Sequence, residues 1–398
     1  MTVIETSPGG TGTRWRAHAA VLAFGAFAVG TDAFVIAGML PDIAGSLGVS
    51  VGAAGQLVTV FSIAYAVLAP ILAALTASWS KRTVLVTALV LFAVGNAVTA
   101  LAPAYWPVLA SRVIAAGGAA LYTASASATA AALAGEEHRG RAISTVMLGI
   151  TVSLALGAPL GTAVGAALGW RATMWIVTAL ALVIVPVVAL RLPDLRQDAA
   201  AGLRSRLAPL ADRRVLTVLA TTVVVFTGIY IPYTYISAVY APAVSGSGNR
   251  MAILLLVFGV AGTAGNLIAG YLTDRQGPRR AVLIATLSLT AVFLVLPAFR
   301  EPFGAAVPAV AVSALFSFMV TAPLQHQIIS FAPPGTQSMV TSLYQSALYL
   351  AISLSGAVGA VGLNVFGAAW FTPFAAAFVA VAAILTWTAG RRSGALQV

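Results

Sequence analysis

The sequence predicts an all-α membrane protein with twelve transmembrane helices and both termini on the cytoplasmic side of the membrane. Three observations support this fold class. Of the 398 residues, 60% are hydrophobic and only 8% are charged, whereas soluble domains carry roughly 25% charged residues. Apolar runs recur along the whole chain, each close to the length of about 20 residues that a helix needs to cross a bilayer. The runs do not alternate apolar and polar residues, so helices are expected and not a β-barrel.

The runs follow one another with short polar interruptions. They occupy residues 18–40, 51–76, 83–102, 107–133, 142–166, 170–191, 215–239, 251–272, 281–299, 303–322, 338–363 and 369–390. The first run is long, contains Asp32 and lacks a small-residue cleavage site, so we expect a retained helix and not a signal peptide. An even number of spans places both ends of the chain on one side.

The net charge of +11 follows this topology. Of the 21 Lys and Arg residues, all but Arg112, Arg171, Arg250 and Arg300 fall in the termini or in loops on the side of the termini. Cytoplasmic loops of membrane proteins carry such an excess. The charge therefore indicates orientation and no nucleic-acid partner. Together with a composition rich in Arg and Ala, it favours a multi-pass protein of the bacterial cytoplasmic (inner) membrane.

The longest polar interruption divides the runs six and six. It predicts an N-terminal six-helix bundle over 1–190, a cytoplasmic linker over 191–214 and a C-terminal six-helix bundle over 215–398. The halves also echo each other, because AALTASWSKRTVL at 73–85 aligns with GYLTDRQGPRRAVL at 270–283. Two six-helix halves in parallel repeat are typical of transporters that bind substrate between the halves.

The loop after the second run of the C-terminal half reads GYLTDRQGPRR, residues 270–280. It resembles the loop signature of the major facilitator superfamily, G-x-L-x-D-R-x-G-x-R-R. The resemblance implies a close helix approach at the first glycine, a tight turn at the second, and a latch between the halves formed by the charged side chains. The residues concerned are Gly270, Asp274, Arg275, Gly277 and Arg279. In the first half, Ala73 and Ser80 stand in place of the two glycines, and Ala77 stands in place of the aspartate. We therefore expect a less firmly locked outward-open state.

The fifth run reads GITVSLALGAPLGTAVGAALGWR, residues 149–171, and places its glycines on one helical face. Such a face lets backbones pack closely, and Pro159 removes a backbone donor and bends the helix. The stretch resembles a motif of proton-coupled exporters within the superfamily, with a shorter first gap. The resemblance implies that Gly157, Pro159 and Gly161 shape the interface that moves during transport; plain helix packing is the alternative.

Two more stretches extend the resemblance. They are GTDAFVIAGMLPDIAGSLGVS in the first run, and Arg112 followed by Gly117 and Gly118 in the fourth. Together the motifs resemble the twelve-helix drug:proton antiporter family, whose bacterial branch includes chloramphenicol-resistance and arabinose-efflux proteins. The resemblance implies the major facilitator fold, in which two six-helix bundles rock about a central cavity. We expect the chain to act as a monomer.

Asp32 is the only acidic residue within a predicted span rather than in a tail, a loop or a helix end. A carboxylate there costs about 2.5–3.5 kcal/mol on insertion scales, and burial favours the neutral form of a carboxyl group. Asp32 is therefore the candidate proton carrier; the alternative is a structural carboxylate. Arg112 is its expected partner because the resemblance implies that the first and fourth helices both line the cavity. The alternative for Arg112 is an arginine that extends to the membrane interface.

Aromatic residues on helices that the fold would bring to the cavity are the candidates for substrate binding. They are Phe34, Tyr65, Tyr122, Phe226, Tyr230, Tyr233, Phe316 and Tyr344. A mostly apolar pocket with few polar groups suits small amphipathic ligands. The alternatives are ordinary packing residues or an aromatic belt at the membrane surface.

The expected function is proton-coupled export of a small amphipathic compound or a drug such as chloramphenicol. The partners are then the substrate, protons and the lipid bilayer. No G-x-x-x-x-G-K-[ST] sequence and no catalytic constellation is present, so we expect neither an ATP-driven pump nor an enzyme, and no cofactor or metal. The alternatives are export of a sugar, nucleoside or other metabolite, an uptake symporter, and a non-transporting membrane sensor on the same fold.

Overall fold

The computed structural model describes residues 11–76, 78–195, 211–332 and 337–394. Within these ranges the chain is helical and has no strand, and 12 helices are long and apolar enough to cross a membrane. The predicted fold class, an all-α membrane protein with twelve spans, is therefore confirmed, and the cytoplasmic location of the termini stays a prediction. The middle of the predicted linker and Ala77 lie outside the described residues, so the predicted domain boundaries stay a prediction.

The first six spans form the N-terminal half. Their helices are α1 (Thr11–Leu47), α2 (Val51–Leu75), α3 (Lys81–Leu101), α4 (Tyr105–Val152), α5 (Ala158–Leu168) and α6 (Trp170–Arg191). Helix α4 holds the fourth span and the first part of the fifth, with a break at Gly135, whose φ is 69°. A π-helical segment, Ser153–Gly157, joins α4 to α5 one turn before Pro159.

The last six spans form the C-terminal half. Their helices are α8 (Arg213–Thr234), α9 (Ile236–Val239), α10 (Ala241–Val244), α11 (Gly248–Gln276), α12 (Pro278–Val295), α13 (Phe303–Phe318), α14 (Thr321–Ser330), α15 (Gln337–Phe366) and α16 (Phe371–Gly394). The tenth span consists of α13 and α14. It therefore continues past residue 322, where the sequence analysis ends it, because the polar residues that follow stay helical.

Short polar side chains begin four of these helices. Ser50, Ser80, Asp212 and Ser247 each accept a hydrogen bond from a backbone N–H in the first turn of α2, α3, α8 and α11 respectively. These groups satisfy donors that a helix start otherwise leaves unpaired. The caps therefore fix where the chain leaves each turn and enters the next helix.

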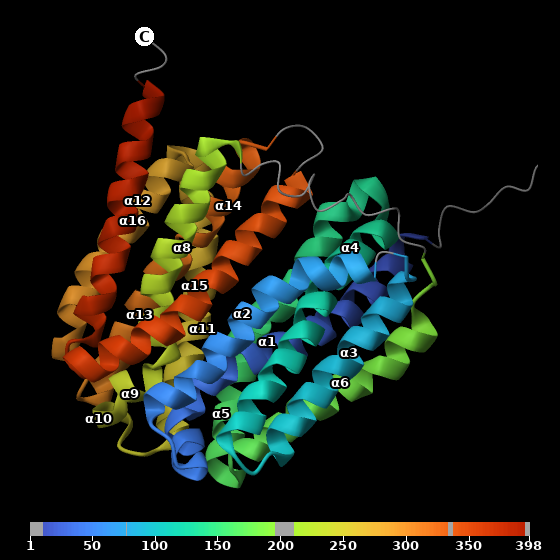
Figure 1. Ribbon diagram of the computed structural model, residues 1–398. Coiled ribbons are helices and arrows are strands. Elements are labelled where there is room, and N and C mark those ends of the chain that lie inside the picture. The colour runs from blue at the N-terminus through green and yellow to red at the C-terminus, as the bar shows by residue number, and fades with distance from the viewer. Residues whose placement is uncertain (1–10, 77, 196–210, 333–336, 395–398) are drawn as a thin grey trace, which may run out of the picture.

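The two halves lie side by side and diverge toward the end that carries the C-terminus (Figure 1). Because successive spans cross in opposite directions, the turns after the second, fourth and eighth spans lie at this end with Lys81, Arg139 and Arg279, and we call it the basic end. At the opposite end the halves are in contact. Gln56 Nε2 donates to the carbonyl oxygen of Gly356 at 3.3 Å. The described conformation is thus closed at the opposite end.

Glycine residues make several of these contacts possible. A Cβ atom on Gly55 of α2 would overlap the Tyr235 ring, and one on Gly248 of α11 would overlap Ala166 of α5. Tyr235 is fully buried, and its hydroxyl donates to the carbonyl oxygen of Gly356 at 2.7 Å. Small residues therefore let the halves pack backbone to side chain without a gap.

The internal repeat is visible in a pair of hydrogen bonds at the basic end. Arg82 of α3 donates to the carbonyl oxygen of Ala189 in α6, 107 residues further along the chain. Arg279 of α12 donates to the carbonyl oxygen of Thr386 in α16, also 107 residues further along. Each arginine thus ties the third helix of its half to the sixth.

The glycine face of the fifth span packs on α1 of the same half. Cβ atoms on Gly149, Gly157, Gly161 and Gly165 would meet Ala23, Thr31, Val35 and Met39 respectively. The expectation that Gly157, Pro159 and Gly161 shape the interface that moves during transport stays a prediction; in this conformation Gly157 and Gly161 pack within the N-terminal half. The fifth span faces the other half through Ala155 and Ala166, which approach Gly259 and Gly248 of α11.

We predict that Gly149→Ala destabilises the protein, because its Cβ would overlap the backbone carbonyl of Ala23, which cannot rotate away. Overpacking of this kind costs about 1–3 kcal/mol. Thermal unfolding of the purified protein in detergent measures the effect. Gly140→Ala is the matched control, because it lies in the same helix and its Cβ would meet nothing within 4 Å. Equal melting temperatures for the two variants would contradict this packing.

Candidate functional site

A cavity of about 250 Å³ lies between the two halves. Its wall is built by α1, α2 and the fourth and fifth spans on one side, and by α8, α14 and α15 on the other. None of the described residues that line it is charged. A concave, mostly apolar space with a few polar groups is typical of a site for a small organic molecule.

Aromatic rings line the cavity from both halves. Five of the predicted residues do so, namely Phe34, Tyr65, Tyr230, Tyr233 and Tyr344. The Phe34 and Tyr233 rings meet edge to face with centroids 6.1 Å apart, and the Tyr233 hydroxyl donates to the Phe34 carbonyl oxygen at 3.2 Å. The rings of Tyr65 and Tyr349 stack at 3.6 Å across the halves. The aromatic wall therefore also connects the halves.

Three of the predicted aromatic residues are not among the described residues that line the cavity. Tyr122 is buried within the N-terminal half, where its hydroxyl donates to the Leu22 carbonyl oxygen at 3.0 Å. Phe226 is buried one turn from Tyr230, and Phe316 packs against the hydrophobic core. These three assignments are corrected. The sequence alone did not separate the core-facing from the cavity-facing side of an all-apolar helix.

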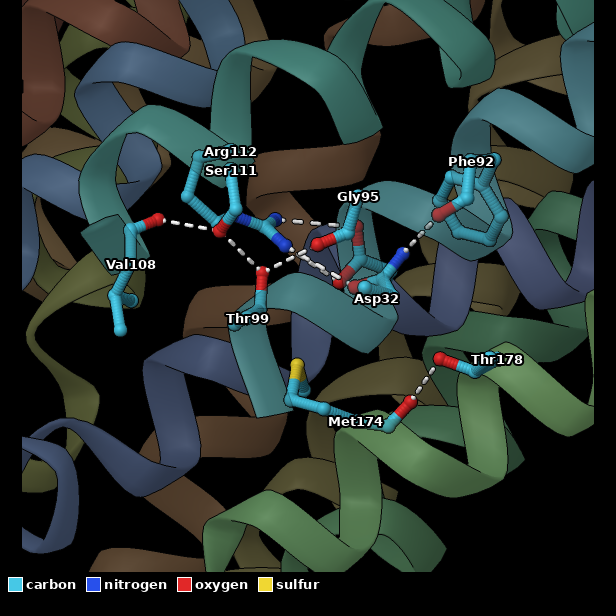
Figure 2. Close-up of polar contacts among 10 residues, drawn as sticks. Asp32, Phe92, Gly95, Thr99, Val108, Ser111, Arg112, Met174 and Thr178 are labelled. Atoms are coloured by element: carbon cyan, nitrogen blue, oxygen red, sulfur yellow. Dashed lines mark hydrogen bonds and ion pairs between the residues drawn. The ribbon is translucent and has the colours of Figure 1, made fainter. Parts of the chain in front are cut away.

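Asp32 of α1 and Arg112 of α4 form a bidentate ion pair (Figure 2). Arg112 Nη1 lies 2.8 Å from Asp32 Oδ1, and Arg112 Nη2 lies 3.1 Å from Oδ2. Their side chains are 0% and 1% exposed, respectively. The structure thus brings the two residues together as the sequence suggests, away from water and in the geometry that gives the strongest charge-assisted hydrogen bonds.

Further groups hold the arginine. Asn96 of α3 accepts a hydrogen bond from Arg112 Nη1 at 3.4 Å and donates to the Phe92 carbonyl oxygen at 3.1 Å. The Phe61 ring lies 4.4 Å from the guanidinium carbon. The sequence analysis missed Asn96, although a buried polar residue within a span is itself a signal of function.

The pair lies behind the cavity wall and not in it. Phe61 lines the cavity and covers Arg112, whereas neither Asp32 nor Arg112 is a lining residue. The first and fourth spans do line the cavity, as expected, through Phe34 and Thr123 among others, while the ion pair lies behind them. Phe61 therefore links a molecule in the cavity to the ion pair.

The loop motif lies at the basic end. Gly277 has a φ of 82° and forms the turn between α11 and α12, as expected. Gly270 has open space where a Cβ would point, so the expected close helix approach is absent there. Arg279 binds carbonyl oxygens of α16, and Arg275 stacks on Tyr271 at 4.5 Å.

Asp274, the acidic residue of the motif, is exposed. Within the described part of the chain it makes no hydrogen bond or ion pair. In this conformation the expected latch through Asp274 is therefore not engaged. This agrees with two halves that diverge at the basic end.

Polar residues that the sequence analysis missed also line the cavity. They are Ser62, Thr123, Thr151, Thr234, Thr321, Gln325 and Gln345. Gln325 falls beyond the predicted end of the tenth span, where a polar stretch resembles a loop. The signal that could have found it is the four-residue spacing from Thr321, which places both on one helical face.

Twelve spans in two halves around a shared cavity define a membrane transporter. The family model of the Major Facilitator Superfamily matches residues 22–356 and 218–395, and the chain belongs to this superfamily.

Several known proteins resemble the chain over most of their length. The MFS-type transporter YbcL of Bacillus subtilis is 34% identical, and the match covers 87% of this chain and 88% of that protein. A chloramphenicol resistance protein of Streptomyces lividans is 32% identical, with 86% and 88% covered. A chloramphenicol efflux pump of Mycobacterium tuberculosis is 30% identical, with 87% and 90% covered.

Solved structures share the fold at much lower sequence identity. The nucleoside transporter NupG superposes with a TM-score of 0.77 at 13% identity, covering 94% of this chain and 99% of that chain. A D-xylose-proton symporter superposes with a TM-score of 0.76 at 15% identity, covering 94% and 98%. These likenesses concern the arrangement of the helices.

We predict that Asp32→Leu destabilises the protein more than Arg112→Leu. Removing one partner of a buried ion pair costs about 3–5 kcal/mol. An orphaned carboxyl group can take up a proton, whereas a guanidinium cannot lose one. The double variant leaves no unpaired charge and should recover much of the loss. Thermal unfolding of all four proteins measures the coupling, and simple addition of the two single effects would show that the pair is not coupled.

Proposed function

We propose that this transporter is a proton-coupled antiporter of the bacterial cytoplasmic membrane that exports small amphipathic compounds of the chloramphenicol type. The observation that carries the proposal is the buried Asp32–Arg112 pair behind the wall of an aromatic cavity. The relatives described as chloramphenicol resistance and efflux proteins support the substrate class. The energy comes from the proton gradient, with no cofactor.

Proton coupling works through the charge on Asp32. Protonation removes the negative charge that holds Arg112, and the guanidinium stays charged. Arg112 then depends on its other neighbours, the side-chain amide oxygen Oδ1 of Asn96 and the face of Phe61. Because Phe61 lines the cavity, a shift of Arg112 changes the cavity wall. A proton on Asp32 and a substrate against Phe61 then favour different arrangements, as exchange requires.

The direction of access follows from the charges at the basic end. Their excess supports a cytoplasmic location for this end, and the halves diverge there. In this conformation substrate would enter from the cytoplasm. Release to the other side requires the halves to part at the opposite end, which breaks the Gln56–Gly356 hydrogen bond and separates Tyr235 from Gly55. Asp274 and Arg275 would meanwhile close the basic end.

Export of a sugar, nucleoside or other polar metabolite is a second candidate. The observation that favours it is the presence of Gln325, Gln345 and several hydroxyl groups in the cavity wall. Cells that carry the gene would then gain tolerance of a metabolite or its analogues and not of chloramphenicol. A panel of both kinds of compound in a sensitive host separates the two. An uptake symporter would accumulate substrate in right-side-out vesicles, and a sensor would move none.

We predict that Asp32→Asn abolishes accumulation of chloramphenicol in inside-out membrane vesicles with an acidic interior. The wild type should accumulate it, and a protonophore should collapse the gradient and release it. The variant should still exchange labelled for unlabelled chloramphenicol, since the cavity is intact. Asp32→Glu is the control that keeps an ionisable group and should retain partial activity. Accumulation by Asp32→Asn at the wild-type rate would remove Asp32 from the coupling mechanism.

A further inference from the structure

The polar side chains of the cavity wall are unevenly distributed between the halves. The only carboxamide groups among the described lining residues are Gln325 of α14 and Gln345 of α15, both in the C-terminal half. Both lie toward the basic end of their helices, whereas Phe34 and Tyr233 lie toward the opposite end. The cavity thus has both carboxamides near one end, where aromatic rings such as Tyr344 line it as well.

A contact between α14 and α15 positions the polar side chains near this end of the cavity. Thr321 and Gln325 are four residues apart on α14, so they share one face of the helix. The Tyr344 hydroxyl lies 3.4 Å from the Thr321 carbonyl oxygen and links α15 to α14. Gln345 follows Tyr344 directly and also lines the cavity. We call Thr321, Gln325 and Gln345 the amide subsite.

The hydrogen-bonding capacity of the amide subsite is not used within the protein. The Thr321 hydroxyl is buried without a partner, and the described contacts include no side-chain hydrogen bond of Gln325 or Gln345. A carboxamide offers two donors and an acceptor that takes up to two bonds. Polar groups in an apolar surrounding cost free energy when they lack partners. These three side chains are therefore available to a ligand.

The charge of the cavity restricts what that ligand can be. None of the described lining residues is charged, and the nearby Asp32 is neutralised by Arg112. A cation or anion in this cavity would lose its hydration without gaining a counter-ion, which is unfavourable. An uncharged molecule with a polar end loses less and can satisfy the amide subsite.

We propose that Thr321, Gln325 and Gln345 determine specificity by binding the uncharged polar end of the substrate, while its apolar part lies between Phe34, Phe61 and Tyr233. The cavity therefore selects neutral over cationic amphipathic molecules. This inference rests on the proposed function only in taking the central cavity as the site of transport.

The test is equilibrium binding to the purified protein in detergent, with chloramphenicol as the neutral probe and tetraphenylphosphonium as the cationic probe. Gln325→Met and Gln345→Met remove the amide and keep the length of the side chain. Each should raise the Kd for chloramphenicol about tenfold. Gln327→Met is the matched control, because Gln327 lies on the same helix but is not a lining residue, and it should leave the Kd unchanged.

A second variant tests the charge argument by a gain of binding. Gln345→Glu places one carboxylate in an otherwise uncharged wall, and it should bind tetraphenylphosphonium at least tenfold more tightly than the wild type. This result supports the subsite even if the wild type does not bind chloramphenicol, in which case only the proposed substrate falls. If the wild type binds chloramphenicol, the inference is overturned by an equal affinity for tetraphenylphosphonium, or by an unchanged chloramphenicol Kd in both Met variants. The absence of a gain in the Glu variant overturns it in either case.

Discussion

A charge in the interior of a membrane protein needs a partner, and this requirement governs the centre of the molecule. The carboxylate of Asp32 and the guanidinium of Arg112 satisfy each other in a fully buried, bidentate pair. Asn96 and Phe61 complete the surroundings of the arginine. The pair ties α1 to α4, while the glycine face of the fifth span holds α1 from the other side. The position of α1, and of the cavity wall it contributes, therefore depends on this ion pair.

The two halves contribute different chemical groups to the centre of the molecule. The N-terminal half contains the ionisable pair, and the C-terminal half contributes the unpaired amides of the cavity. Phe61 is the physical link, since one face of its side chain meets Arg112 and it also lines the cavity. A change of charge in one half can thus alter the space available to a molecule that contacts both. At the opposite end the two halves meet through glycine contacts, so they can separate there without breaking a large polar network.

The sequence predicted the fold because lipid leaves few options for so apolar a chain. It also singled out Asp32 and Arg112, since a charge within a span is rare and costly. It did not identify which helical faces meet. Tyr122 and Tyr230 are both aromatic residues in apolar spans, yet one is buried in the N-terminal half and the other lines the cavity. Gln325 was missed because polar residues near the end of a span resemble a loop. The helix on which the fifth span packs was not predicted, because its glycines would fit a neighbour in either half.

The central claim is that substrate and proton compete through Asp32. The most direct measurement is the release of protons when chloramphenicol is added to the purified protein in weakly buffered detergent solution, with Asp32→Asn as the reference. The account predicts proton release by the wild type, saturating as the binding site fills, and none by the variant, although the variant binds the ligand. Binding by both proteins without proton release by either would contradict it and leave Asp32 a structural partner of Arg112.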